Sequence, residues 1–290
     1  MSTSAQDSFG QPGPARTGPS ARASRPAAFF DLDKTIIARS SLFAFSRPFL
    51  AGGLITRRAV VRNAYAHFLF QVGGADHDQI ERTREYLTAL VAGWDVQQVR
   101  DIVAETLEQQ IVPVVYREAT ELIEHHHRAG RDVVIVSASG SEVVEPIGAL
   151  LGADHVIATR IVVDHGVYTG ALDFYAYGEN KAVAVRELAA QRGYDLSSSF
   201  AYSDSVTDLP LLEAVGHPHA VNPDRPLRRE AALRGWPVLD FTQPMSLRDR
   251  LPRLTPPPRS VKVASGALAG GVVAAALTYL VTRRRVQRSG

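Results

Sequence analysis

Two pairs of aspartates are the residues of this sequence whose type and spacing best suit chemistry. Asp31 and Asp33 end the apolar run of residues 27–33, AAFFDLD, and Asp204 and Asp208 follow a second such run at residues 199–203. Paired carboxylates can act as nucleophile and general acid/base, and they can hold a divalent cation. The chain has no cysteine, so thiolate chemistry is excluded and any metal site must use oxygen or histidine ligands.

The elements that position these acids are predicted to be parallel strands. Residues 27–33, 132–137 and 199–204 are short apolar runs that end in acidic or small polar residues, as expected of buried strands whose carboxyl ends face a ligand. Helical stretches at residues 141–151 and 180–192 separate them. Alternating strands and helices predict an α/β fold with a doubly wound parallel sheet, and ligands gather at the carboxyl ends of such strands.

Residues 40–127 interrupt this alternation. They predict four amphipathic helices, at residues 56–71, 78–92, 95–109 and 113–128, and no strand. We therefore expect a helical cap of residues 40–127, inserted into a core of residues 27–39 and 128–241. The consecutive residues His125, His126 and His127 point about 100° apart on a helix and predict a solvated helix end, not a metal site. Residues 163–169 predict a β-hairpin.

The two ends of the chain differ from the middle in composition. Residues 1–26 predict a disordered tail without a signal peptide, and residues 242–262 predict a Pro/Arg-rich linker. Residues 263–282 carry no charge and are long enough to span a bilayer as a helix, and a basic tail, residues 283–290, follows them. We expect a single-pass C-terminal membrane anchor; a helix lying on the surface or packed on the body is the alternative. The positive-inside rule favours a cytoplasmic location for the Arg-rich end, but the missing export signal and the absence of cysteine favour a cytoplasmic body, which we expect.

Composition and charge limit the partners of this chain. The formal net charge is +2 and the excess basic residues lie near the ends, which argues against a nucleic-acid-binding face. Hydrophobic residues make up 45% of the chain and charged residues 21%, which predicts a folded globular body. Gly266 and Gly270 would let two membrane helices approach closely, so a dimer stays open, although this spacing also arises by chance in an Ala/Gly-rich segment.

The sequence DLDKT at residues 31–35 resembles the DxDxT motif of haloacid dehalogenase (HAD)-superfamily phosphatases. Three further motifs of that family follow in order: Ser137 at a strand end, Lys181 at a helix start, and Asp204 with Asp208 after the last strand. The resemblance implies a HAD-like Rossmannoid core. It also implies that Asp31 attacks phosphorus to form an aspartyl-phosphate, while Asp33 protonates the leaving oxygen and then activates water.

The same resemblance implies a Mg²⁺ cofactor and a phosphate site. The metal ligands would be the carboxylates of Asp31 and Asp204 and the backbone carbonyl of Asp33, with Asp208 in support. Lys181 would balance the charge on Asp31 and on the phosphoryl group. The residues that would bind the phosphate are Thr35, Ser137, Ala138 and Lys181.

Two residues decide between two alignments of the aspartate motif, which differ in the residue that acts as the nucleophile. The DKT at residues 33–35 also resembles the DKTGT sequence of P-type ATPases, in which Asp33 would be the nucleophile. Ile36 and Ile37 stand where that family has Gly and Thr. The register therefore favours Asp31 as the nucleophile.

The substrate is less constrained than the chemistry. The helical cap and the sequence YGENKA at residues 177–182 resemble the phosphoserine-phosphatase-like group of the superfamily (subfamily IB). Residues 37–42 lack the Glu with which that group binds the substrate amine, so we expect a small phosphomonoester other than phosphoserine. A lipid-like substrate would suit a membrane anchor and the aromatic residues of the cap, although aromatics at helical spacing more often form a core. These residues are Phe43, Phe45, Phe49, Tyr65, Phe68 and Phe70.

Two other functions fit the same sequence. A membrane-tethered regulatory or interaction protein could keep the HAD fold without catalysis, and a phosphotransferase would use the same residues with an alcohol in place of water.

Overall fold

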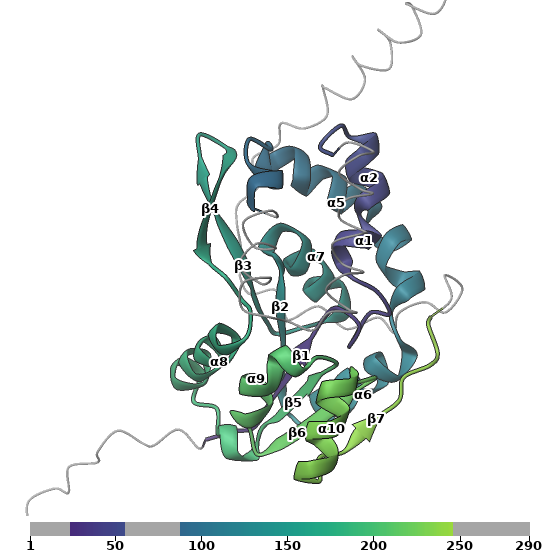
Figure 1. Cartoon of the computed structure of the whole chain (residues 1–290), viewed down its shortest axis with the longest axis vertical. Coiled ribbons are helices and arrows are strands. Elements are labelled where there is room, and N and C mark those ends of the chain that lie inside the picture. Colours follow the sequence, from purple (N-terminus) through teal and green to yellow (C-terminus); the bar gives the residue numbers. More distant parts are fainter. Residues whose placement is uncertain (1–23, 56–87, 246–290) are drawn as a thin grey trace, which may run out of the picture. The chain divides into compact units, whose positions relative to one another are not determined.

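The computed structural model describes residues 24–55 and 88–245 (Figure 1). Within these residues a seven-stranded sheet has the order β4-β3-β2-β1-β5-β6-β7. The predictions for residues 1–23, for the helix at 56–71 and most of that at 78–92, and for residues 246–290 lie outside the described part. The predicted membrane anchor is among them, and no helix of the described segments is long and apolar enough to cross a bilayer.

The centre of the sheet is formed by the three strands predicted from the apolar runs. These strands are β1 (Ala27–Asp31), β2 (Asp132–Gly140) and β5 (Phe200–Ser203). β1 pairs in parallel with both neighbours, and Phe29 lies opposite Val134 on one side and Ala201 on the other. The chain leaves β1 toward β2 and β3 and later returns to its other side through β5, so the strand order switches at β1. Such a switch point is where α/β sheets bind ligands.

The outer strands are β3 (His155–Asp164), β4 (Val167–Phe174), β6 (His217–Val221) and β7 (Val238–Leu239). β3 and β4 are antiparallel and form the predicted hairpin, whose turn holds His165 at φ 47° and Gly166 at φ 83°. Two consecutive positive φ values are typical of a two-residue type I′ turn. The other strand pairs are parallel.

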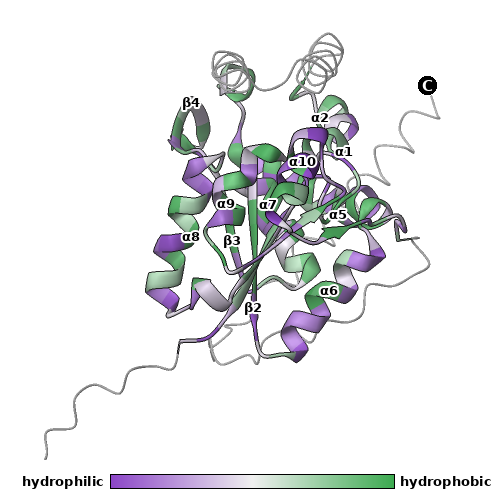
Figure 2. Cartoon of the chain, turned by 60° about the horizontal axis from the view of Figure 1, so that its bottom comes forward, coloured by the Kyte–Doolittle hydropathy of each residue, from purple (hydrophilic) through white to green (hydrophobic). Residues whose placement is uncertain are grey.

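Helices cover both faces of the sheet. One face packs against α8 (Glu179–Arg192), α9 (Leu209–Glu213) and α10 (Arg225–Arg234), and the other packs against α6 (Arg117–Arg128) and α7 (Ser141–Leu151). Figure 2 shows β2 and β3 between α8 and α6. Alternate residues of β1 serve the two faces, because Phe29 lies in one hydrophobic cluster and Phe30 in the other. The predicted doubly wound α/β fold is confirmed.

The prediction of a solvated histidine triplet is wrong for His126. This side chain is 1% exposed and lies on the buried face of α6, in phase with Ala119 and Ile123. Its Nδ1 accepts a hydrogen bond from Arg131 Nε at 2.8 Å, and its Nε2 lies 2.9 Å from the Tyr202 hydroxyl of β5. α6 therefore packs on the sheet, although all its residues but the last fall within the range predicted as the cap.

The described part of the insertion is helical. It contains α1 (Ser41–Ala44), α2 (Ser46–Ala51), α5 (Val96–Ile111) and the 3-10 turn η1 (Val112–Val114). α5 packs against α7, and Val99 and Val103 of α5 share one hydrophobic cluster with Val144 and Ile147 of α7. The same cluster contains Phe45 and Phe49, which are buried. The described helices thus continue the core that covers one face of the sheet.

Candidate active site

The carboxyl end of β1 carries a buried ion pair. Asp31 is the last residue of β1 and is 6% exposed. Lys181 Nζ donates hydrogen bonds of 2.7 Å to Asp31 Oδ1 and of 2.7 Å to Asp208 Oδ2, and Lys181 itself is 3% exposed. Ser203, at the end of β5, donates to the same Asp208 oxygen at 2.7 Å. Three segments far apart in the sequence therefore meet at the switch point of the sheet.

Local backbone geometry explains how Lys181 reaches this place. α8 begins at Glu179, and the preceding Gly178 has φ 55° and ψ −129°, a conformation that is open mainly to glycine. Lys181 lies in the first turn of α8 and points back to the strand ends. Asp208 ends the 3-10 turn η3 (Val206–Asp208), which follows β5 after two residues.

Burial dominates the electrostatics of this ion pair. It raises the pKa of Asp31 to about 7, although the neighbouring Lys181 ammonium opposes the shift. Burial by itself would lower the pKa of Lys181, but the charges of Asp208 and Asp31 outweigh it and hold that pKa above its usual value. An ammonium that stays charged between two carboxylates can stabilise further negative charge that develops beside Asp31.

Asp204 is a buried carboxylate of a different kind. It directly follows β5, is 8% exposed, and its side chain accepts no hydrogen bond from the described residues. Burial and then the charge of Asp31 raise its pKa to about 8. Two neighbouring carboxylates of this kind need a cation to stay ionised together. No cluster of three His or acidic side chains with metal-site spacing occurs in the described segments, so a cation here would need backbone or water oxygens as well.

Asp33 lies beyond the strand end and is held by hydroxyl and amide donors. The Ser41 amide donates to Asp33 Oδ1 at 2.8 Å, and Ser139 Oγ donates to Asp33 Oδ2 at 3.1 Å. Burial raises the pKa of Asp33, and these hydrogen bonds oppose the rise. The intervening Lys34 has φ 64°, a left-handed conformation that is uncommon for a residue with a side chain and that turns the chain between Asp33 and Thr35.

The predicted phosphate-binding residues lie near these acids. Thr35 is fully buried and its hydroxyl has no hydrogen-bond partner among the described residues. Ser137 follows Val136, which is paired with Asp31 across the sheet. The Ser137 Oγ accepts a hydrogen bond from the Ser139 amide at 3.2 Å. The Ala138 carbonyl accepts a hydrogen bond from Thr159 Oγ1 at 2.7 Å.

A family model for haloacid dehalogenase-like hydrolases matches residues 28–213, a range that includes all these residues. The chain belongs to the haloacid dehalogenase-like hydrolase family. The family resemblance inferred from the DxDxT motif is thereby confirmed.

Curated relatives of this family member match most of its length. The chain is 63% identical over 262 residues to an inhibition of morphological differentiation protein of Streptomyces azureus, covering 90% of this chain and 95% of the relative. It is 56% identical over 273 residues to a probable phosphatase of Mycobacterium tuberculosis, covering 93% and 94%. A phosphoserine phosphatase of M. tuberculosis is 33% identical over 261 residues, covering 89% and 81%. These matches confirm the likeness to the phosphoserine-phosphatase-like group.

A solved structure supports the same fold for this family member. It is a protein of unknown function from Bordetella pertussis Tohama I, with 31% identity and a TM-score of 0.67, and the match covers 76% of this chain and 100% of that one.

Other residues of this HAD-like site were not predicted from the sequence. Ser203 contacts Asp208, and Ser41 and Ser139 contact Asp33. Small polar residues after strands are commonplace, so no sequence pattern marks these three serines. Their role in the site is recognised only from the structure, in which the strand ends lie together.

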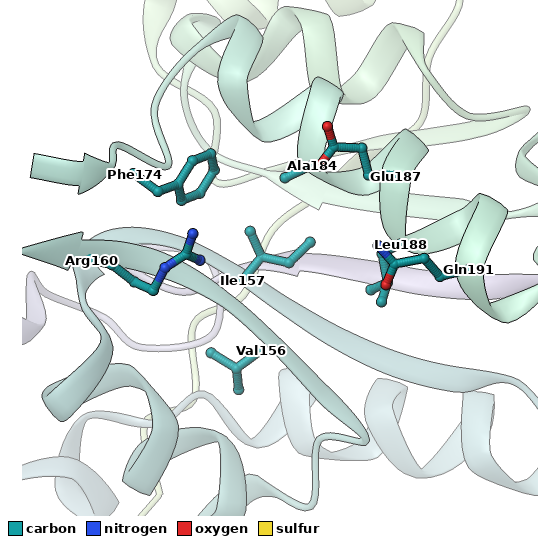
Figure 3. A pocket seen from close by; sticks show the side chains of 8 residues that line it. All are labelled: Val156, Ile157, Arg160, Phe174, Ala184, Glu187, Leu188 and Gln191. Atoms are coloured by element: carbon teal, nitrogen blue, oxygen red, sulfur yellow. The ribbon is translucent and has the colours of Figure 1, made fainter.

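A separate cavity of about 230 Å³ lies between β3, β4 and α8, and none of the predicted catalytic residues lines it (Figure 3). Arg160 and Phe174 face it from the two strands, and Glu187 and Leu188 face it from α8. Arg160 is already engaged, because its Nε donates to Asp173 at 2.8 Å and its guanidinium lies 5.0 Å from the Phe174 ring centroid.

Proposed function

We propose that this protein hydrolyses small phosphate monoesters with Mg²⁺, through an aspartyl-phosphate, a mixed anhydride formed on Asp31. The observation that carries the proposal is the buried Asp31–Lys181–Asp208 ion pair network at the switch point of the sheet. Family membership supports a hydrolase, and the phosphatase names of the relatives support phosphate esters as the substrates.

The chain's own residues would divide the reaction into two steps. A carboxylate oxygen of Asp31 attacks phosphorus, and the bond from phosphorus to the alcohol oxygen breaks. Asp33 gives its proton to that oxygen, so the product leaves as the alcohol. In the second step Asp33 takes a proton from water as the water oxygen attacks the phosphoryl group, which releases inorganic phosphate and restores Asp31. Lys181 holds Asp31 in place and offsets negative charge during both steps.

The donor set fits Mg²⁺. The carboxylates of Asp31 and Asp204 and the backbone carbonyl of Asp33 would hold the ion, which prefers a few carboxylate or carbonyl oxygens and retained waters. Asp204 fits this role because it is buried without a hydrogen-bond donor among the described residues. When bound, the ion would neutralise phosphate charge and align the reacting groups.

We infer a substrate without an ammonium group near its phosphate. Residues 37–42 offer no acidic side chain to bind an amine, and a buried unpaired ammonium binds poorly. Phe45 and Phe49 are 0% and 2% exposed and pack against each other in the core, with Phe49 also beside Trp94, so they do not line a site for an acyl chain. Phe45 and Phe49 therefore give no support to a lipid-like substrate, and Tyr65, Phe68 and Phe70 lie outside the described residues.

The test is a phosphatase assay of the purified full chain with and without Mg²⁺, beside Asp31→Asn. The panel would include phosphoserine, glycerol phosphates and lysophosphatidate. We expect activity that requires Mg²⁺ and is lost in Asp31→Asn, with phosphoserine turned over poorly. Adding glycerol as an acceptor and measuring glycerol phosphate against inorganic phosphate separates a phosphotransferase from a hydrolase. An inactive wild type across the panel would favour the catalytically silent alternative.

We also propose that residues 263–282 anchor the protein in a membrane, with the body in the cytoplasm. The support for the anchor is the uncharged length of this segment. The cysteine-free sequence suits a cytoplasmic body, whereas the basic residues after the segment favour the opposite orientation by the positive-inside rule. Cell fractionation of the full chain and of a variant lacking residues 259–290 tests the anchor. We expect the full chain in the membrane fraction and the shortened chain outside it. Cross-linking of the membrane-bound form tests whether Gly266 and Gly270 mediate a dimer.

A further inference from the structure

The carboxyl group of Asp33 accepts hydrogen bonds from two serines that also contact each other. Ser41 donates its amide to Asp33 Oδ1 at 2.8 Å, and the Ser41 hydroxyl lies 3.3 Å from Asp33 Oδ2. Ser139 Oγ donates to Asp33 Oδ2 at 3.1 Å. The two serine hydroxyls lie 2.8 Å apart. Both carboxylate oxygens of Asp33 therefore have fixed partners, which limits the rotation of this side chain.

The two serines come from different parts of the fold. Ser41 is the first residue of α1, where the inserted helices begin, and it is 0% exposed. Ser139 lies near the end of β2, two residues after Ser137. Asp33 itself follows β1. The orientation of its carboxyl group thus depends on how the start of the insertion sits against two central strands of the sheet.

We propose that Ser41 and Ser139 are positioning residues that hold the Asp33 carboxyl group toward the leaving-group oxygen. This inference rests on the proposed phosphatase function, in which Asp33 is the general acid and base. A proton donor is effective only within hydrogen-bond reach of the atom that receives the proton. Ser41 holds Asp33 from α1, and Ser139 holds it from β2. Removing either hydroxyl therefore frees the carboxyl group to rotate away from the leaving-group oxygen.

A simpler role must be distinguished from this one. Asp33 accepts from the first amide of α1 and so also caps that helix. If the serines only stabilised the start of α1, their loss would lower stability and would reduce all activities in the same proportion. A role in proton donation instead depends on the leaving group, because an alcohol of high pKa needs a proton to leave and a nitrophenolate does not.

The first experiment compares substituted phenyl phosphates in the full-length enzyme with Mg²⁺. The variants are Ser41→Ala and Ser139→Ala, with Ser139→Thr as the version that retains a hydroxyl. Ser46→Ala is the matched control, because the Ser46 hydroxyl, within the described part of the chain, donates to a nearby backbone group, the Phe43 carbonyl at 2.8 Å. We expect kcat/KM, which reports the step in which the leaving group departs, to fall about 10-fold or more for phenyl phosphate in the alanine variants and less than about 3-fold for p-nitrophenyl phosphate. Ser139→Thr should retain most of the phenyl phosphate activity.

The second experiment is a double-mutant cycle with Asp33→Asn. If the serines act through Asp33, Ser139→Ala should cause no further loss of kcat in the Asp33→Asn background. Equal losses of kcat/KM for both substrates, additive effects in the cycle, or unchanged kinetics would each overturn the positioning role. These outcomes differ from a failure of the proposed function, which would appear as a wild type that is inactive or as an Asp31→Asn variant that is fully active.

Discussion

Replacing Lys181 by methionine removes the ammonium from between two buried carboxylates. Lys181 lies 2.7 Å from an oxygen of Asp31 and 2.7 Å from an oxygen of Asp208. At an effective dielectric constant of about 20, unit charges roughly 4 Å apart attract by about 4 kcal/mol, so the two pairs contribute about 8 kcal/mol. Removing the ammonium from water offsets several kcal/mol of this. We therefore expect Lys181→Met to lower the free energy of unfolding by about 3–5 kcal/mol at neutral pH.

The size of this loss should depend on pH. The pKa of Asp31 is about 7 in the folded protein even beside Lys181, against an ordinary value of 3.8. Without the ammonium, the folded-state pKa of Asp31 rises further, while that of the unfolded chain does not change. The folded variant then binds more protons than the unfolded chain above about pH 4, so its stability falls as the pH rises. The loss should be largest near pH 9 and clearly smaller near pH 5.

Urea unfolding of the wild type and of Lys181→Met, in the presence of a chelator at both pH values, measures this loss. Arg186→Met is the matched control, because Arg186 forms an exposed ion pair with Glu179 on the same helix and its loss should change stability little. A loss below about 1 kcal/mol at high pH, or a loss of equal size at both pH values, would refute the electrostatic reasoning.

Four further substitutions test the fold. Gly216→Ala should lower the free energy of unfolding by about 2 kcal/mol or more in urea unfolding, because its Cβ would lie 1.7 Å from the Ser197 carbonyl oxygen; Gly140→Ala, whose Cβ would meet nothing within 4 Å, should change it little. His165→Asn should raise the melting temperature slightly, because asparagine tolerates the positive φ of the hairpin turn better, and a lower value would count against the type I′ assignment. His126 has its pKa lowered by burial to about 3, so the unfolded chain binds the extra proton below its ordinary 6.5 and stability falls as the pH drops from there. The slope, about 1.4 kcal/mol per pH unit from this group, should be smaller in His126→Gln, and equal slopes would contradict this assignment.

The central strands and the acids were predictable because burial leaves a clear pattern in the sequence. Apolar runs that end in acids mark parallel strands, and the residues at their ends must converge once the strands pair. The pairing of Lys181 with Asp208 could be inferred only by way of the family resemblance, since no local pattern links residues 27 positions apart.

The misassigned and missed features have physical reasons. His126 lies in a polar window, yet Ala119, Ile123 and His126 have the spacing of one helix face, so the helical phase could have identified it. β6 contains Pro218, which argues against a central strand. The structure accommodates this proline because β7 pairs with Ala220 and Val221 and does not reach Pro218, so among the described strands β6 pairs there with β5 alone.

The packing of α5 on α7 limits how the active site can open. Val99 and Val103 of α5 share a buried cluster with Val144 and Ile147 of α7. Exposing a buried side chain of this size costs about 1.5–3 kcal/mol, so separating the two helices would expose four of them at a cost of roughly 6 kcal/mol or more. That cost approaches the total stability of many domains. Substrate entry and product release should therefore leave this contact intact, and a motion that detached α5 from α7 would amount to partial unfolding.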